Sequence, residues 1–125
     1  MKTPHILMMA AGTGGHVFPA LAVSEELTKR GAVIHWLGTP NGMENGLVAP
    51  TGYPFHAIEM QGLRGKGIGR LLKMPVTLLS ATMAVIKIIR GNNIDIVVGF
   101  GGYVSAPGGI AARLTKTPLI IHEQN

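Results

Sequence analysis

Two glycine-rich segments hold the residues of this 125-residue chain that could do chemistry. The first is Gly12-Thr13-Gly14-Gly15-His16, which lies between an apolar run and a helical pattern. At such a place, loop amides and a helix N-terminus can hold a phosphate, and glycine lets the ligand approach the backbone. The second segment runs from Gly99 to Gly109 and also follows an apolar run. Two such loops that face each other across one crevice could bind a diphosphate.

His16 is the candidate acid–base group of the first loop. An imidazole at a helix N-terminus, beside a bound anion, can act as a base or as a hydrogen-bond donor. Taken alone, the residue fits a capping or packing role better. His5, His35 and His56 lie in or beside apolar runs and are interpreted as structural, and the pattern assigns no role to His122.

Two common phosphate-binding signatures do not fit the chain. The dinucleotide motif G-x-G-x-x-G needs glycine where Val17 stands, and the second apolar run ends in Trp36-Leu37-Gly38-Thr39, without an acid for a ribose hydroxyl. The loop G-x-x-x-x-G-K-[ST] is absent, because Gly65-Lys66 is followed by Gly67. The chain has no cysteine, which excludes thiolate catalysis and metal sites built on cysteine.

Alternating strand and helix signals must position the two loops. We expect strands at residues 5–10, 33–37, 54–59, 95–99 and 119–122. We expect helices at residues 17–30, 43–48, 71–90 and 105–115, with Pro19 in a first turn and Pro75 near a first turn or at a kink. This alternation predicts a Rossmann-like, doubly wound parallel sheet of strand order 3-2-1-4-5, in which strands one and four flank the switch point.

The composition is that of one globular α/β domain. Hydrophobic residues make up 46% of the chain and charged residues 14%, with a mean hydropathy of +0.33, and such a chain is too apolar to be disordered. The apolar run after His5 is too short for a signal peptide, and the richest stretch, 71–89, contains Lys73, Pro75 and Lys87. The sequence therefore predicts a cytosolic chain that does not cross a membrane.

Positive charge is concentrated between Glu59 and Asp95, a segment without acidic residues. Its cations are Arg64, Lys66, Arg70, Lys73, Lys87 and Arg90. The apolar residues beside them are Ile68, Leu71, Leu72, Met74, Leu78 and Leu79. Such a segment could attract an anionic membrane surface or a phosphorylated ligand, although composition alone favours an ordinary solvated helix face. Nucleic acid is not an expected partner, because the segment has no aromatic residue on which a base could stack.

Four ordered segments resemble the MurG family, the bacterial UDP-N-acetylglucosamine transferases that convert lipid I to lipid II. They are residues 11–22, residues 62–67, Gly101-Gly102-Tyr103-Val104-Ser105 with Pro107-Gly108-Gly109, and His122-Glu123-Gln124-Asn125. One position departs from the family pattern, because Ala11 stands where the first loop usually begins with a glycine. If that position required positive φ or close contact with phosphate, the loop geometry would differ here.

The resemblance implies the amino-terminal, acceptor-binding half (residues 1–125) of a two-domain GT-B glycosyltransferase, with a carboxy-terminal donor-binding domain outside this chain. It implies inverting transfer of N-acetylglucosamine from UDP-GlcNAc to the 4-hydroxyl of the muramoyl sugar of lipid I, without metal or cofactor. The fragment alone is expected to be inactive. The implied setting is the cytoplasmic face of the bacterial inner membrane, with the cell-wall and division machinery as further partners.

The resemblance also implies roles for particular residues. His16 is the base on the attacking hydroxyl or orients phosphate. The donor would touch Thr13, Gly14, Gly15 and Asn125. The acceptor diphosphate would lie against Gly12, Gly101, Gly102, Tyr103 and Ser105. The membrane surface would contact Arg64, Lys66, Ile68, Arg70, Leu72, Lys73 and Leu79.

Two other classes of function compete with the transferase. A non-catalytic Rossmann-type module could bind a nucleotide or a phosphorylated metabolite, and detectable NAD binding would favour it. A peripheral membrane adaptor without chemistry would explain the basic segment but leave the two glycine loops without a role. The missing acid after the second strand and the basic, apolar segment 63–79 favour the transferase.

Overall fold

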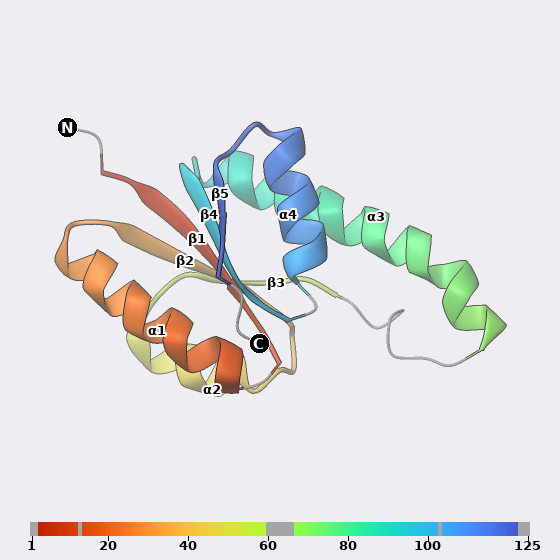
Figure 1. Cartoon of the computed structure of the whole chain (residues 1–125), viewed down its shortest axis with the longest axis horizontal. Helices are drawn as coiled ribbons and strands as arrows, with labels where there is room; N and C mark the ends of the chain where they lie inside the picture. The colour runs from red at the N-terminus through yellow and green to blue at the C-terminus, as the bar shows by residue number, and fades with distance from the viewer. Residues whose placement is uncertain (1–2, 13, 60–66, 103, 123–125) are drawn as a thin grey trace.

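The computed structural model describes residues 3–12, 14–59, 67–102 and 104–122. Five parallel strands form one sheet in the order β3-β2-β1-β4-β5 (Figure 1). The strands are β1 (His5–Ala10), β2 (Val33–Gly38), β3 (Phe55–Ala57), β4 (Ile96–Gly101) and β5 (Leu119–Ile121). The predicted fold class, strand order and switch point between the first and fourth strands are therefore confirmed.

Helices cover both faces of this sheet (Figure 1). They are α1 (Gly14–Lys29), α2 (Glu44–Val48) with the short 3₁₀ turn η1 (Ala49–Thr51), α3 (Ile68–Gly91) and α4 (Ser105–Leu114). On one face, Met8 of β1 shares a core with Val17 of α1 and Val48 of α2. On the other face, Leu7 shares a core with residues of α3 and α4. Successive side chains of β1 point to opposite faces, and both faces are covered, so the strand is apolar from Ile6 to Ala10.

Several element boundaries differ from the predicted ones. Helix α1 begins at Gly14 rather than at residue 17, so Pro19 lies inside the helix and not in its first turn. Glycine and proline have low helix propensity, but the burial of Val17 and Ala20 in the core outweighs that preference. Strand β4 continues to Gly101, beyond the predicted end at residue 99. The edge strand β3 is shorter than predicted, because it has a partner on one side only.

Helix α3 is longer than predicted and projects beyond the sheet (Figure 1). It begins at Ile68, so that Pro75 lies well inside it. Its segment Leu71–Gly91 is long and apolar enough to cross a membrane by length and composition alone. Lys73, Pro75 and Lys87 therefore do not by themselves exclude a membrane span, contrary to the prediction from the sequence. The carboxyl-terminal half of α3 packs on the core and on α4, although the apolar window as a whole is 22% buried, and one helix of this kind is weak evidence of a membrane span.

Candidate active site

Both glycine-rich loops lie at the carboxyl edge of the sheet. Strands β1 and β4 are neighbours and run parallel, so the loops that follow them leave from the same edge (Figure 1). The amide of Ala11 in the first loop donates to the carbonyl oxygen of Gly101 in the second at 3.4 Å. The predicted meeting of the two loops is therefore confirmed, at the switch point where open α/β sheets bind ligands.

Glycine is required at the point where the loops touch. Gly12, Gly101 and Gly102 have φ values of 96°, 113° and 98°, which side chains disfavour. A Cβ atom on Gly101 would overlap the imidazole of His16, and one on Gly102 would overlap the carbonyl of Ala11. The absence of side chains thus brings the two backbones together at this edge.

Ala11 does not carry the strain that its departure from the family pattern could have caused. Its φ is not positive; the turn to positive φ comes one residue later, at Gly12. The side chain of Ala11 is 1% exposed and packs in the core beneath α3 and α4. The alanine is therefore accommodated, and the left-handed turn of the first loop is kept.

A β-bulge in β4 orients His16. Met9 of β1 pairs with Gly99 and the next residue, Ala10, pairs with Gly101, so Phe100 is the extra residue. The carbonyl oxygen of Phe100 accepts a hydrogen bond from His16 Nδ1 at 2.7 Å. A carbonyl can only accept, so Nδ1 carries the proton, and in the neutral ring Nε2 carries the lone pair. This is the tautomer in which Nε2 can act as a base.

The start of α4 lies at the same edge and is the next candidate contact for an anion. The N-cap residue Val104 makes no side-chain capping hydrogen bond. The amide of Ser105 donates to the carbonyl oxygen of Gly102 at 3.2 Å. Pro107 has no amide hydrogen, so the amide of Ala106 is the candidate donor of this first turn. The buried hydroxyl oxygen of Ser105 has no hydrogen-bond partner among the described residues. Buried polar groups are almost always paired, and because this oxygen is buried, a ligand oxygen reaches the hydroxyl only after the side chain rotates.

The other predicted site residues are placed as follows. Gly14 and Gly15 form the first turn of α1, beside His16. Thr13, Tyr103, Asn125, Arg64 and Lys66 lie outside the described residues, and for Arg70 only the backbone position in α3 is described. The described part of the chain holds no group of three or more His, Cys, Asp or Glu residues arranged to bind a metal ion.

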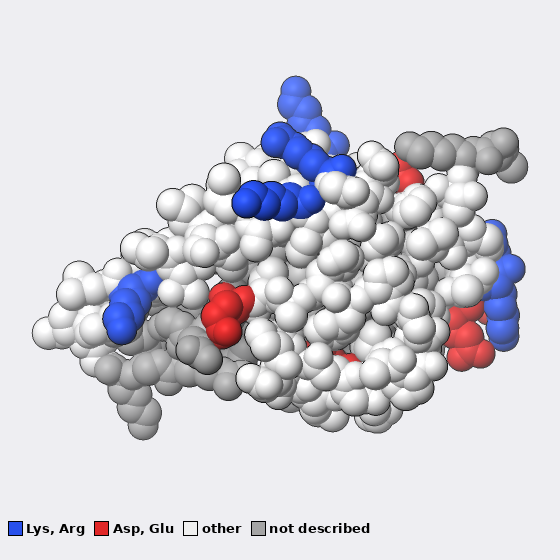
Figure 2. Space-filling model, turned by 180° about the vertical axis from the view of Figure 1, so that it is seen from behind, with Lys and Arg blue, Asp and Glu red and all other residues white. Residues whose placement is uncertain are grey.

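Helix α3 exposes an apolar surface along its projecting half. The exposed side chains are Ile68, Leu71, Leu72, Val76, Leu79 and Met83, with Ile68 exposed by 75% and Leu79 by 65%. Met74 and Leu78 are half-buried, and Lys73 is exposed. In Figure 2, the projecting end of α3 is covered mostly by uncharged side chains. Four of the six apolar residues noted in the sequence beside the cations, Ile68, Leu71, Leu72 and Leu79, are therefore exposed.

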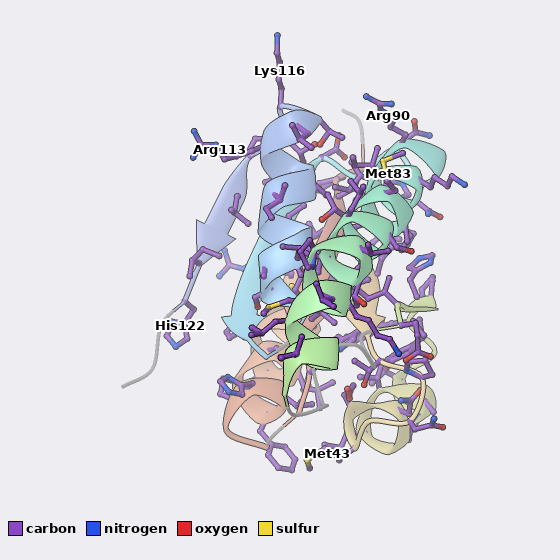
Figure 3. The ribbon with its side chains drawn as sticks, turned by 90° about the vertical axis from the view of Figure 1, so that its right-hand side faces the viewer. Met43, Met83, Arg90, Arg113, Lys116 and His122 are labelled. Atoms are coloured by element: carbon purple, nitrogen blue, oxygen red, sulfur yellow. The ribbon has the colours of Figure 1, made fainter. Side chains whose placement is uncertain are left out.

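Other cations lie far from the glycine loops. Figure 3 shows Arg90, Arg113 and Lys116 gathered at one end of the molecule, whereas His122, which follows β5, lies toward the carboxyl edge. The ring of His122 is tilted against that of Phe100, with centroids 5.2 Å apart. These three cations are therefore not placed to bind a phosphate at the glycine loops (Figure 3).

Three histidines bridge the strands on the α3 face of the sheet. His5 Nδ1 lies 3.2 Å from His35 Nε2, and His35 Nδ1 lies 3.3 Å from His56 Nε2. Burial lowers the pKa of His35, and the charges of His56 and His5 lower it further. Burial also lowers the pKa of His56. These contacts agree with the structural role predicted for the three residues.

Sequence reasoning missed two groups at this site. The carbonyl of Phe100 was not predicted, although glycines inside a strand pattern are a known signal of a bulge. The indole of Trp36, which donates to the carbonyl of Ala10 at 3.0 Å, was not predicted either. A lone tryptophan in a buried strand gives no sequence signal of the carbonyl that it will bind.

Comparison with known proteins places this fold in one class. Residues 6–125 match the glycosyltransferase family 28 N-terminal domain, and the chain belongs to that family. This membership favours a transferase over the non-catalytic module and the membrane adaptor.

Individual relatives make the likeness more specific. The chain is 99% identical, over all 125 residues, to the UDP-N-acetylglucosamine--N-acetylmuramyl-(pentapeptide) pyrophosphoryl-undecaprenol N-acetylglucosamine transferase of Psychrobacter cryohalolentis. It is 97% identical to the protein of the same name from Psychrobacter arcticus. Each alignment covers 100% of this chain and 35% of the relative, so the chain spans about a third of their length. The crystal structure of Acinetobacter baumannii MurG is similar with a TM-score of 0.87 and 51% identity, over 98% of this chain and 36% of that one. The MurG resemblance found in the sequence is therefore confirmed.

Proposed function

We propose that this chain is the acceptor-binding domain of an enzyme that transfers N-acetylglucosamine from UDP-GlcNAc to lipid I, giving lipid II for peptidoglycan synthesis. The observation that carries the proposal is 99% identity, over the whole chain, to a protein named for this transfer. A carboxy-terminal domain that holds most of the donor completes the enzyme in this proposal, in line with relatives about three times as long.

The acceptor diphosphate lies between the two glycine loops. Gly12, Gly101 and Gly102 allow phosphate to reach the backbone, and the amide of Ala106 in the first turn of α4 offers a donor. The hydroxyl of Ser105, which has no hydrogen-bond partner among the described residues, donates to a phosphate oxygen once its side chain rotates toward the ligand. Tyr103, in the same loop, completes this side of the acceptor site.

His16 acts as the general base in this mechanism. Its Nε2 takes the proton of the muramoyl 4-hydroxyl as that oxygen attacks the anomeric carbon of N-acetylglucosamine. The bond from the anomeric carbon to the phosphate oxygen of UDP breaks, and the electron pair leaves with UDP. Attack opposite the leaving group inverts the α-linked donor to a β-linked product. Thr13, Gly14, Gly15 and Asn125 touch the donor from this side of the cleft.

Docking to the membrane is the second part of the proposal. The lipid-linked acceptor lies in the bilayer, and the projecting half of α3 presents Ile68, Leu72 and Leu79 beside Lys73. Arg64, Lys66 and Arg70 belong to the same cationic segment. An apolar surface with a cationic rim suits the anionic cytoplasmic face of the inner membrane. Contact with the cell-wall and division machinery follows from the resemblance alone and has no assigned residue.

One experiment tests the proposed reaction. The chain is extended with the downstream sequence of the Psychrobacter cryohalolentis relative, and transfer from UDP-GlcNAc to a lipid I analogue is measured. We expect transfer by the extended protein and none by residues 1–125 alone. An extended, folded protein that binds UDP-GlcNAc but does not modify the analogue would overturn the proposed acceptor.

A further inference from the structure

The only tryptophan of the chain reaches from β2 to the end of β1. Trp36 is fully buried, and its indole Nε1 donates a hydrogen bond of 3.0 Å to the carbonyl oxygen of Ala10. The pairing between β1 and β2 ends one residue earlier, at Met9 and Leu37. The indole therefore supplies a donor to a buried carbonyl that lies beyond the last pair of the ladder.

The peptide unit between Ala10 and Ala11 is held at both of its polar ends. Trp36 binds its oxygen, and its N–H donates to the carbonyl of Gly101 at 3.4 Å. A peptide unit is planar, so fixing the oxygen and the N–H fixes the rotation of the whole plane. Ala11, at one end of this peptide unit, is followed directly by Gly12 of the first loop. The N–H of the same unit contacts Gly101 of the second glycine-rich segment. The orientation of this plane therefore sets the spacing between the two loops.

We propose that Trp36 is a positioning residue, whose indole holds this peptide plane and thereby keeps the first glycine loop and His16 in register with the second loop. The identity of the ligand, a diphosphate, rests on the proposed function. Without the indole donor, the carbonyl of Ala10 stays buried and unpaired, which is costly. The plane then rotates toward another donor, and the contact between Ala11 and Gly101 is lost.

The uniqueness of Trp36 allows a test that removes one hydrogen-bond donor and little else. Biosynthetic replacement of tryptophan by benzothienylalanine alters this residue alone, because the chain has a single tryptophan. Sulfur then replaces the indole N–H, while the shape of the ring is retained. The control is Val85→Ala, which removes buried volume on α3, in the core on the opposite face of the sheet. Val85 belongs to the same core as the side chain of Ala11, but the control keeps both hydrogen bonds of the peptide plane and therefore tests lost stability alone.

Three measurements follow the consequences in both proteins. Amide hydrogen exchange of Ala11 is compared with that of Leu7, in the middle of the same strand. The ¹⁵N signals of the His16 ring report its tautomer, and calorimetry measures the affinity for inorganic pyrophosphate. In the benzothienyl protein we expect Ala11 to exchange roughly tenfold faster relative to Leu7, the effect of losing about one hydrogen bond. We also expect a changed His16 signal and weaker pyrophosphate binding, whereas Val85→Ala leaves all three unchanged.

The outcomes separate this proposal from the proposed function. An unchanged exchange ratio and an unchanged His16 signal in the benzothienyl protein would overturn the role of Trp36. Equal changes in the benzothienyl protein and in Val85→Ala would also overturn it, since they would reflect lost stability alone. If the unsubstituted chain fails to bind pyrophosphate, the proposed diphosphate site is wrong, and the exchange ratio and the His16 signal still decide the role of Trp36.

Discussion

His16 is tied to a backbone group 84 residues further along the chain, since its Nδ1 atom lies 2.7 Å from the carbonyl oxygen of Phe100. The carbonyl is available because Phe100 is the extra residue of a bulge and does not pair with β1. One irregularity of β4 thus fixes the tautomer of a histidine that follows β1. The carbonyl oxygen of Phe100 orients the imidazole of His16, as a carboxylate orients the histidine of a catalytic triad.

Removal of the imidazole should lower turnover far more than donor affinity. In the enzyme extended by its downstream domain, His16→Ala should reduce kcat by roughly 10²- to 10⁴-fold, the usual contribution of a general base. Steady-state kinetics with a lipid I analogue measure the effect, and UDP-GlcNAc binding is the control. An unchanged kcat would leave His16 with a structural role in the loop.

A side chain at Gly101 should disrupt the contact between the loops. Its φ is 113°, and a Cβ atom there would overlap the ring of His16, so Gly101→Ala should both strain the backbone and displace the imidazole. We expect a loss of about 1 kcal/mol or more in stability, together with a large loss of activity. Thermal unfolding and transfer assays measure the two effects.

A matched glycine in α2 provides the control for that substitution. Gly46 lies inside a helix, and a Cβ atom there would have no neighbour within 4 Å. Gly46→Ala should therefore stabilise the chain by up to about 1 kcal/mol and leave activity unchanged. Similar losses in both variants would show that the overlap with His16 has no special effect.

Mild acid should destabilise the fold through the strand-bridging histidines. Burial, and then the charges of His56 and His5, lower the pKa of His35 below its ordinary 6.5 in the folded chain, and burial lowers the pKa of His56. The unfolded chain therefore binds more protons than the folded chain as the pH falls below about 6.5. The neutral rings therefore contribute their full stabilisation to the fold above that pH. This stabilisation is lost as the pH falls through the lowered pKa values of the two histidines in the folded chain.

Urea unfolding at several pH values checks this dependence. The free energy of unfolding should fall between about pH 7.5 and 5.5, a window above the ordinary pKa of carboxylates. His56→Gln removes one of the two shifted groups and should flatten the dependence. A wild-type stability that does not change across this window would contradict the prediction.

Much of the fold follows from local patterns that the core reinforces. The apolar runs at residues 5–10 and 33–37 predict buried strands because both faces of the sheet are covered, and every residue after the first of each run is buried. Gly31 predicts the end of α1, since its φ of 96° suits a position just after a helix. The strand order follows from the β-α alternation and the handedness of crossovers.

Features that depend on distant residues could not be predicted in this way. The bulge at Phe100 depends on the register of β4 against β1, and register arises only when the two strands meet. The start of α1 at Gly14 depends on packing that outweighs the low helix propensity of glycine. The hydrogen bond from Trp36 to Ala10 joins residues 26 positions apart, and no local pattern encodes it.

Binding to membranes should depend on charge and on the exposed surface of α3. A shallow apolar surface enters the headgroup region, while neighbouring cations are attracted to anionic lipid. The double variant Arg70→Gln/Lys73→Gln removes two of these cations. It should weaken binding to anionic vesicles by about 1 kcal/mol for each cation removed. Higher salt should weaken it too, because screening shortens the reach of the attraction. Vesicle cosedimentation across a range of salt concentrations measures both effects.

The apolar part of this surface and the position of the charges need separate controls. Leu72→Ser/Leu79→Ser should weaken binding at every salt concentration, since both side chains are exposed and apolar. Arg113→Gln/Lys116→Gln removes the same amount of charge from the end of the molecule away from the carboxyl edge (Figure 3) and should have little effect. If the chain bound neutral and anionic vesicles equally, or if both charge variants lost binding equally, the basic segment would be an ordinary solvated helix face.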